Sequence, residues 1–341
     1  MSNSTNTRHH GPTVRRKLLT SVSATTLFVS AYTVGEALAA NAASDRPPVW
    51  IEIGGDYFQL DDSWQKFNPP FASNIPGDLP SPMSVERSPV SAFDWEGKLS
   101  IQPEDSDWVL KAAVRFGHAG GDSKVLKSLT STSPKQFVDY QASASERHTI
   151  LDFTVGRDVG VGLFGGTGTG TLSGGVRMAQ FISRAAADLN HTFVYAKYDN
   201  VFDATTQEHR NFHGVGPEIT WEASQPILEN TDLGKVAIDW GLNAAVLFGR
   251  QRATLQQTVN YIHRHYVQYS SVKPAGRVRN VTVPNVGAYV GLSMNYRNAK
   301  ISAGYRTDFF FGAMDGGIDT AKSYDRGFFG PYASVSIGLG G

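Results

Sequence analysis

Carboxylate and imidazole side chains lie close together in the sequence between residues 199 and 213. Asp199 and Asp203 precede His209 and His213, and an Asp–His pair can perform general acid–base or nucleophilic catalysis when the two groups come within hydrogen-bond reach. The spacing singles out no particular pair. We therefore predict that the protein is not an enzyme and keep these four residues as the enzymatic alternative.

Two further motifs could bind a ligand. The sequence GVGLFG at Gly160–Gly165 matches the G-x-G-x-x-G pattern of dinucleotide-binding loops, but that pattern needs a helix directly after it to hold the pyrophosphate. The next residues are GTGTGT, which favour a turn. His263 and His265 would share one face of a strand, where a weak metal or phosphate contact competes with plain loop polarity. We predict no cofactor and no metal.

Composition excludes several classes of protein. The 341 residues carry 31 basic and 31 acidic side chains, whereas a general nucleic-acid binder would carry a basic excess, so no nucleic acid is expected as a partner. The sequence contains no cysteine, which excludes a disulfide framework, a thiolate nucleophile and a cysteine-ligated metal.

The N-terminus is a segment distinct from the rest of the chain. Basic residues at Arg15–Lys17 precede a mildly apolar stretch, Leu18–Val34, and small residues at Ala37–Ala39. This order is typical of a secretory signal peptide with its cleavage site. The alternative is an uncleaved anchor, but the stretch is weakly apolar and the cleavage pattern follows at once. We predict a signal peptide at residues 1–39 and a short periplasmic segment at 40–48.

Alternation of apolar and polar side chains dominates the mature chain. Beyond residue 40 there is no run of 18 apolar residues that could form a transmembrane helix. In residues 235–249, one face contains Ile238, Trp240 and Leu242, while Asp239 lies on the other. This alternation lasts about twice as long as a usual strand of a soluble protein, which raises the question of which solvent each face meets.

Alternation of this kind recurs ten times between residue 49 and the C-terminus. Long polar connections alternate with shorter ones, as in an up-and-down outer-membrane barrel with extracellular loops and periplasmic turns. We therefore predict an all-β, antiparallel transmembrane barrel of ten strands at residues 49–341. The long connections are predicted at 61–90, 119–144, 184–209, 250–282 and 313–325, and the shorter ones at 103–107, 159–171, 224–233 and 297–299.

The strand number and the fold each have an alternative. His191–Asp199 and Val259–Tyr269 are also strand-like, so they form either hairpins above the membrane or additional strands that raise the number to twelve. A soluble β-sandwich would alternate too. Its interior would be dry, however, and one face of these segments carries too many charges for a dry core.

The two faces of the predicted wall meet two different solvents. Apolar side chains face lipid, and charged side chains face the lumen, where they must be hydrated or paired. The predicted lipid-facing residues are Trp95, Trp108, Phe116, Trp221, Ile238, Trp240, Leu242, Phe248 and Phe309. The predicted pore-lining residues are Glu52, Asp94, Glu96, Lys98, Lys111, Arg115, Asp152, Arg177, Glu218, Asp239, Lys300, Arg306 and Asp308.

Charge and barrel size together suggest a function. With Asp56 and Glu222, the inward face carries nine acidic and six basic groups. Barrels of about eight strands are filled by side chains and barrels of sixteen leave a channel, so ten strands lie near the boundary. We predict an outer-membrane pore that passes small hydrophilic solutes or ions by diffusion, with a weak preference for cations. The alternative is a plugged structural or adhesive barrel that acts through its loops at 61–90 and 250–282.

Two stretches resemble a known family. NFHGVGPEITW at Asn211–Trp221 and the C-terminal sequence Ala303–Gly341 are similar to the pore-forming outer-membrane proteins of the Legionella-type major outer membrane protein family. The resemblance implies a porin-like barrel, integral and multi-pass in the outer membrane, with adhesion as a second role. It implies no catalytic residues.

The expected partners are those of an outer-membrane barrel. They are outer-membrane lipid and lipopolysaccharide, the barrel assembly machinery, and small solutes or ions. Many such barrels end on an aromatic residue that the assembly machinery recognises, whereas this sequence ends Leu339–Gly340–Gly341. Larger porins are often trimers, and the sequence leaves a homo-oligomer open.

Overall fold

The computed structural model describes residues 48–61, 91–103, 106–129, 135–159, 168–194, 199–231, 234–264, 266–296, 298–316 and 323–339. Ten strands account for almost all of them. They are β1 (Val49–Asp61), β2 (Ser91–Ile101), β3 (Trp108–Leu129), β4 (Lys135–Asp158), β5 (Thr169–Val194), β6 (Asp199–Thr231), β7 (Gly234–His263), β8 (Tyr266–Tyr296), β9 (Ala299–Asp315) and β10 (Ser323–Leu339). The predicted signal peptide, the segment at 40–47, most of the predicted loop at 61–90, the GVGLFG motif and His265 lie outside the described residues.

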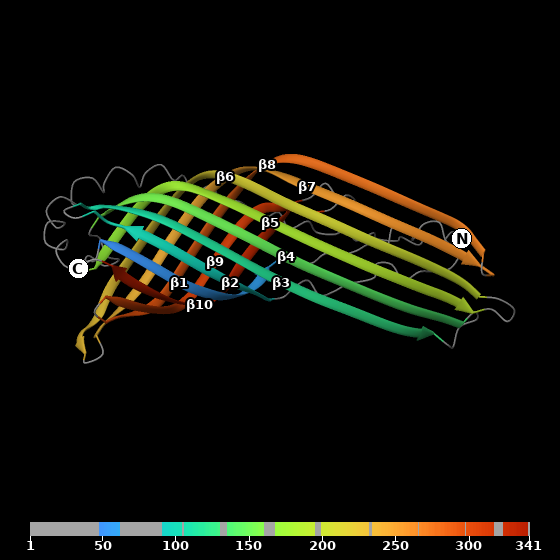
Figure 1. Ribbon diagram of the computed structural model, residues 1–341, viewed down its shortest axis with the longest axis horizontal. Helices are drawn as coiled ribbons and strands as arrows, with labels where there is room; N and C mark the ends of the chain where they lie inside the picture. Colours follow the sequence, from blue (N-terminus) through green and yellow to red (C-terminus); the bar gives the residue numbers. More distant parts are fainter. Residues whose placement is uncertain are drawn as a thin grey trace, which may run out of the picture.

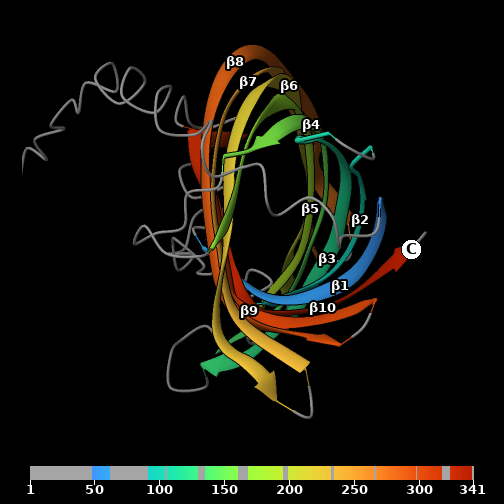
Figure 2. The ribbon, with the colours of Figure 1, turned by 90° about the vertical axis from the view of Figure 1, so that its left-hand side faces the viewer.

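The ten strands form one closed antiparallel ring. Each strand pairs with the next along the chain, and β1 pairs with β10 to close the barrel. Figure 1 shows the tilted strands from the side, and Figure 2 shows the ring from one end. The predicted fold class and the number of ten strands are confirmed. The described residues of His191–Asp199 and Val259–Tyr269 belong to the outer ends of β5, β6, β7 and β8, as in the predicted hairpin alternative, and do not form additional membrane-spanning strands.

The wall of the barrel has two chemically different faces because successive side chains of a strand point to opposite sides. Large apolar side chains are exposed on the outside all round the ring, for example Ile53 on β1, Trp95 on β2, Phe153 on β4 and Val290 on β8. A closed barrel leaves no unpaired strand edge in lipid. The apolar belt therefore meets the hydrocarbon of the membrane. Within the described residues, no helix is long and apolar enough to cross a membrane.

One side of the wall is much taller than the other. Strands β3 to β8 contain 22 to 33 residues, whereas β1, β2, β9 and β10 contain 11 to 17. The tall strands continue beyond the ring as a six-stranded sheet, on the right of Figure 1. We call this sheet the extension. It consists of residues 120–129, 135–145, 183–194, 199–210, 252–264 and 266–278.

The extension corrects the prediction that residues 119–144, 184–209 and 250–282 are loops. The residues of these ranges that the structure describes are paired strands of hairpins. Polarity suggested loops, but alternation persists there: Ala185, Ala187 and Leu189 are buried on the inner face of β5, while Arg184 and Asp188 are exposed on its outer face. An extracellular sheet is polar on the face that meets water, so composition alone does not distinguish it from a loop.

The connections at the opposite end are short. β6 runs to Thr231, past the predicted start of a turn at residue 224, and its pairing with β7 is irregular near Pro226 and Leu228. β7 then begins at Gly234, whose φ of 112° suits a residue without a side chain. Because outer-membrane barrels have short periplasmic turns, this end faces the periplasm and the extension faces outward.

The absence of cysteine from the sequence allows a direct test of this orientation. Ser143 is exposed on the extension, and Asn298 is exposed in the β8–β9 turn. We expect Ser143→Cys to react with a membrane-impermeant maleimide in intact cells, and Asn298→Cys to react only after the outer membrane is permeabilised. The opposite labelling pattern would show that the barrel is inserted the other way round.

Candidate functional site

The lumen gathers the charged residues of the barrel. All thirteen predicted pore-lining residues lie on the inner faces of their strands. Each is an even number of positions away from another inward residue of the same strand, and alternate residues of a strand share one face. Most are buried or half-buried. Burial of a charge in a barrel is costly unless the charge is paired, so the decisive question is which partners they have.

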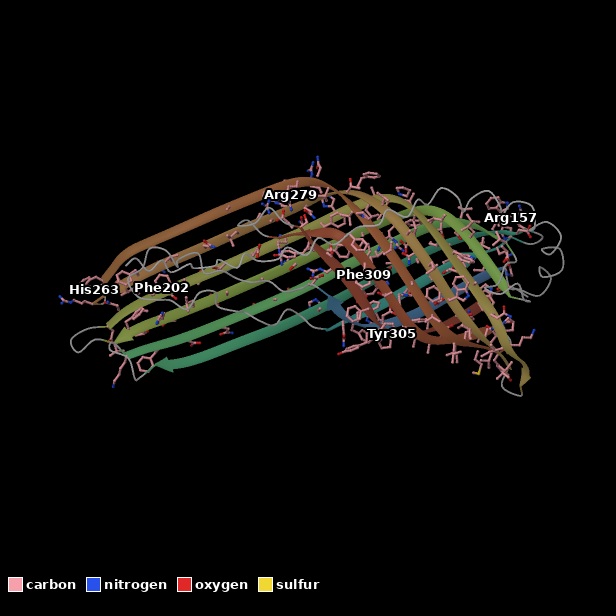
Figure 3. All side chains as sticks on the ribbon, turned by 180° about the vertical axis from the view of Figure 1, so that it is seen from behind. Arg157, Phe202, His263, Arg279, Tyr305 and Phe309 are labelled. Carbon is pink, nitrogen blue, oxygen red and sulfur yellow. The ribbon has the colours of Figure 1, made fainter. Side chains whose placement is uncertain are left out.

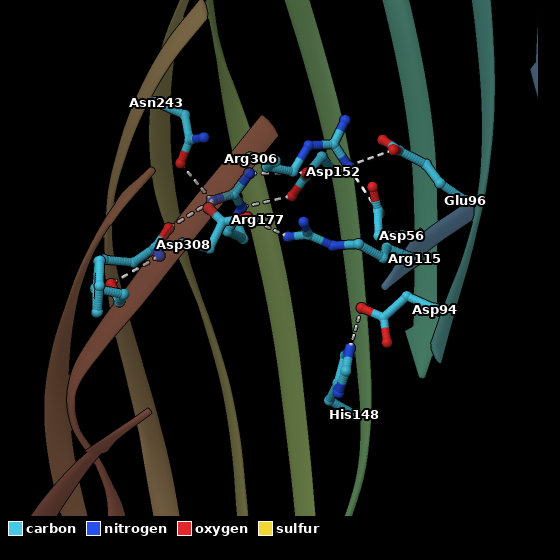
Figure 4. Close-up of polar contacts among 12 residues, drawn as sticks. Asp56, Asp94, Glu96, Arg115, His148, Asp152, Arg177, Asn243, Arg306 and Asp308 are labelled. Carbon is cyan, nitrogen blue, oxygen red and sulfur yellow. Dashed lines mark hydrogen bonds and ion pairs between the residues drawn. The ribbon is translucent and has the colours of Figure 1, made fainter. Parts of the chain in front are cut away.

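Arg177 on β5 is the centre of the densest group of contacts (Figure 4). Its Nε donates to Asp152 Oδ1 at 2.7 Å and its Nη2 donates to Asp152 Oδ2 at 2.9 Å, which is a bidentate pair with β4. Nη2 also lies 2.6 Å from Glu218 Oε1 on β6. Nη1 donates to the amide oxygens of Asn243, at 2.8 Å, and Asn285. One guanidinium thus joins five strands.

Two further arginines span the lumen beside Arg177. Arg115 on β3 lies 2.6 Å from Asp308 on β9, and Asp308 is also 4.0 Å from Arg177. Arg306 on β9 forms ion pairs with Glu96 on β2 and with Asp56 on β1, the latter at 3.3 Å. These contacts connect both sides of the ring at one level.

Aromatic rings hold the Arg306 guanidinium from the sides. Its central carbon lies 5.2 Å from the ring centre of Tyr332 and 5.8 Å from that of Tyr289, within the range of a cation–π contact. The two tyrosine rings meet edge to face at 6.0 Å. Arg306 is therefore fixed by packing as well as by charge.

A second level of ion pairs lies nearer the periplasmic end. Glu222 on β6 accepts from Lys98 on β2 at 3.3 Å and also from Lys111 on β3. Lys300 pairs with Asp239 at 2.6 Å. Every one of these residues was assigned to the lumen from sequence, but the sequence did not indicate which acid would meet which base.

Towards the extracellular side the lumen becomes aromatic. Phe58, Phe181, Phe212, Phe310 and Phe328 are fully buried and belong to one apolar cluster, which we call the aromatic layer. The ring of Phe181 lies 5.8 Å from those of Phe212 and Phe328 and 4.9 Å from that of Phe310.

A buried Asp–His pair adjoins the aromatic layer. His148 Nε2 lies 2.7 Å from Asp94 Oδ2, and the His148 ring is 4.3 Å from that of Phe328. Gly117 lies between them in the pairing of β2, β3 and β4. A side chain at Gly117 would occupy the positions of the Asp94 carboxylate and the His148 ring, so glycine makes room for the pair.

A polar group of residues covers the extracellular side of the aromatic layer. Arg326 on β10 lies 2.8 Å from Glu146 on β4, and Arg210 on β6 donates to the backbone oxygen of Asp315 at 3.0 Å. The Asp315 carboxylate pairs with Arg277 and, at 3.0 Å, with Arg279. Burial lowers the pKa of Arg210, but a guanidinium stays charged in a protein.

Many of these contacts join opposite walls of the barrel. β5 and β10 are five strands apart in either direction round the ring of ten, yet Phe181 and Phe328 touch. Lys98 to Glu222, Arg115 to Asp308 and Glu146 to Arg326 each join strands that are four apart. Two cavities among the lumen charges measure about 80 and 170 Å³. In this conformation the lumen is filled by its own side chains.

The nine predicted lipid-facing residues all lie on outer faces, with one correction. Trp240 is only 8% exposed because Trp221 packs edge to face against it at 4.5 Å. Its neighbours Ile238 and Leu242 on β7 remain exposed. Trp240 therefore meets another ring rather than lipid.

The predicted enzymatic alternative is not assembled. Asp199, Asp203, His209 and His213 all lie on the outer face of β6, and Asp203 and His209 are six positions apart, which is about 20 Å along a strand. His263 Nδ1 lies 2.6 Å from Asn200 Oδ1. Among the described residues, no group of three or more His, Asp and Glu could hold a metal ion.

Sequence analysis did not find the aromatic layer or the Asp94–His148 pair. The available signal was a break in the pattern: the inward residues at 169–179 of β5 and 214–224 of β6 are small or charged, and Phe181 and Phe212 come directly after and before them. An inward aromatic residue in a small barrel indicates a filled lumen, because an open lumen would expose it to water.

Comparisons with known proteins add little to this picture. No protein-family profile and no curated protein matches the chain. Among solved structures, a mutant of the TodX monoaromatic hydrocarbon channel aligns with 90% of this chain and 95% of its own at 11% identity and a TM-score of 0.28. The transport unit of the autotransporter AIDA-I from Escherichia coli aligns with 90% and 96% at 10% identity and a TM-score of 0.25.

The P. putida toluene transporter TodX aligns with 91% of this chain and 95% of its own at 10% identity and a TM-score of 0.21. At these identities the proteins inform neither solute nor partner. The similarity to the Legionella-type family still rests on the two quoted stretches alone. The closed ring, the apolar belt and the charged lumen make this chain an integral, multi-pass β-barrel of the outer membrane.

Proposed function

We propose that this protein is a closed outer-membrane barrel that acts at the cell surface through its extension. The single observation that supports this proposal most strongly is contact between opposite walls, namely Phe181 with Phe328 and Arg115 with Asp308. A diffusing ion needs a continuous path of water, and side chains occupy that path at several levels. The function is thus structural or adhesive, and no catalytic step is part of it.

Energetics support a lumen that stays closed. Opening it would separate buried ion pairs such as Arg177–Glu218, and removing one partner of a buried pair typically costs about 3–5 kcal/mol. Several such pairs lie at different levels, so opening would require many of them to break together. The extension, in contrast, presents six strands to the exterior.

A diffusion pore with a weak preference for cations is the second candidate. It is favoured by the excess of nine acidic over six basic groups among the inward residues predicted from sequence, and by cavities of about 80 and 170 Å³ that are lined by charges of both signs. In this alternative the ion pairs would exchange partners with water, and the net acidic wall would select small cations.

Single-channel recording distinguishes the two functions. We expect the refolded mature chain in a planar bilayer to show no discrete conductance steps, while a refolded porin of sixteen strands, as a positive control, conducts. Discrete steps with a cation-leaning reversal potential would overturn the closed barrel and favour the pore. In that case Glu52→Gln, at the periplasmic end of the lumen, should weaken the cation preference.

A further inference from the structure

The outer face of the tall wall carries basic residues directly above the apolar belt. Strand pairing places its side chains in three lateral rows. The first row is Phe116, Thr149, Gln180, His213, Arg250 and Asn280; the second is His118, Arg147, Ile182, Asn211, Arg252 and Val278; the third is Gly120, Ser145, Arg184, His209, Thr254 and Gly276.

These three rows have a strong charge bias. They contain four exposed arginines and three histidines but no carboxylate. By strand pairing, the next outward carboxylates are Asp122, one row farther from the membrane, and Asp188, two rows farther. Burial lowers the pKa of His209, and the positive charges of Arg184 and Arg252 lower it further. Both arginines therefore lie near His209.

Two adjoining hollows lie on this same face. The lower one, of about 890 Å³, is lined by the apolar side chains of Leu151, Met178, Val215 and Phe248, and its upper rim carries Arg250. The upper one, of about 1180 Å³, is lined by small and uncharged polar residues together with Arg184 and His209, and also by Glu208, whose parity places its side chain on the inner face. The face is therefore apolar next to the belt and cationic farther from it, toward the exterior. The acyl chain and the headgroup of a membrane lipid lie in the same order.

Glycine leaves the upper hollow open. Gly120 and Gly276 lie on the outer face and contribute no side chain there. Gly214 on β6 and Gly249 on β7, which pair beside the lower hollow, have the inward parity of their strands. A side chain on either would collide with the Phe212 ring, so these two glycines make room for the aromatic layer inside the barrel.

We propose that this face binds a phosphorylated lipid of the outer leaflet, with its phosphate between Arg184, Arg250 and Arg252 and one acyl chain in the lower hollow. The chemistry fits, because arginine forms bidentate hydrogen bonds to phosphate and the lower hollow is continuous with the belt that meets hydrocarbon. This inference does not depend on the proposed function, because the site lies on the outer face of the barrel and whether the lumen conducts does not affect it.

The position of the arginines favours a lipid over a soluble anion. All four lie within three rows of the edge of the belt, which is the level of lipid headgroups, and the outer face of the more distant extension carries Asp188 and Asp203 instead. A site for a free anion would gain nothing from the apolar lower hollow.

The test measures lipid binding to the full-length protein in detergent by native mass spectrometry. The probes are diphosphorylated lipid A, the same lipid without phosphates, and inorganic phosphate. We compare wild type with the triple variant Arg184→Gln, Arg250→Gln, Arg252→Gln, and use Arg157→Gln as the control. Arg157 is an exposed arginine at the opposite end of the barrel (Figure 3).

A basic residue near an anionic lipid surface contributes about 1 kcal/mol, which is about fivefold in affinity. We therefore expect the triple variant to bind diphosphorylated lipid A about a hundredfold more weakly and Arg157→Gln to bind like wild type. Removing the phosphates should weaken binding to wild type to a similar extent. Heat-modifiable migration on a gel confirms that each variant is folded.

Other outcomes would overturn the inference. Equal binding of lipid A by wild type and the triple variant would place the lipid elsewhere. Full displacement of lipid A by inorganic phosphate at a similar concentration would indicate a site for a free anion. Val215→Trp, which fills the lower hollow, should weaken lipid A binding without changing phosphate binding; an unchanged affinity for lipid A would contradict the assigned position of the acyl chain.

Discussion

Replacing Arg177 with methionine is expected to lower the free energy of unfolding of the barrel by about 3–5 kcal/mol. The Arg177 side chain is only 4% exposed and is the shared partner of Asp152 and Glu218. Methionine fills a similar volume but leaves these carboxylates close together without a cation. Urea-induced unfolding in lipid vesicles, followed by tryptophan fluorescence, measures the change.

Two further variants show whether the ion pairs are the cause. Arg157→Met removes an exposed arginine that pairs with Asp107 at 3.1 Å, and an exposed pair contributes about 0–1 kcal/mol. Arg177→Lys keeps the charge but cannot reproduce the bidentate contact, so its stability should fall between those of wild type and Arg177→Met. A loss of less than about 1 kcal/mol in Arg177→Met would mean that water solvates this part of the lumen, and would favour the open pore.

Truncation of Phe181 or Phe328 to alanine is expected to cost about 3–5 kcal/mol each, because each change opens a cavity in a packed apolar layer. The two losses should not add. The rings touch at 5.8 Å although their strands lie on opposite sides of the barrel, so a double-mutant cycle should give a coupling of about 0.5–1.5 kcal/mol.

The matched control for this cycle is Phe153→Ala. Phe153 is 52% exposed on the outer face of β4, so its truncation should cost less and should show no coupling to Phe181, since distant residues act additively. Absence of coupling between Phe181 and Phe328 would contradict contact across the lumen and would remove the main support for a closed barrel.

Sequence reasoning predicted the barrel well, because the signal for it is local. The alternation from Val236 to Phe248 indicates which side chains point outward, and this inference requires no information about the neighbouring strand. Ten such segments with alternating connections specify an up-and-down ring. The same parity placed Arg177 and Asp308 on the inner face.

The state of the lumen was not predictable in this way, because it depends on contacts between strands far apart in the ring. Parity puts Arg115 and Asp308 on the inner face, but only the curvature and stagger of the closed barrel bring the Arg115 guanidinium within 2.6 Å of the Asp308 carboxylate. Most of the extension was missed for a different reason, although His191–Asp199 and Val259–Tyr269 were offered as hairpins above the membrane. Its polar outer face resembles that of a loop, and its inner alternation depends on alanine, a weak hydrophobic signal.

The unequal height of the wall also gives the extension two lateral strand edges. β8 pairs with β9 only from Asn285 to Tyr296, so among the described strands its outer stretch has a neighbour on one side alone. Such an edge can template the addition of a further strand from another chain. Pro274 and Pro284 interrupt this stretch of β8, and proline has no N–H to donate to an incoming strand. The edge is thereby protected against self-association at the crowded cell surface.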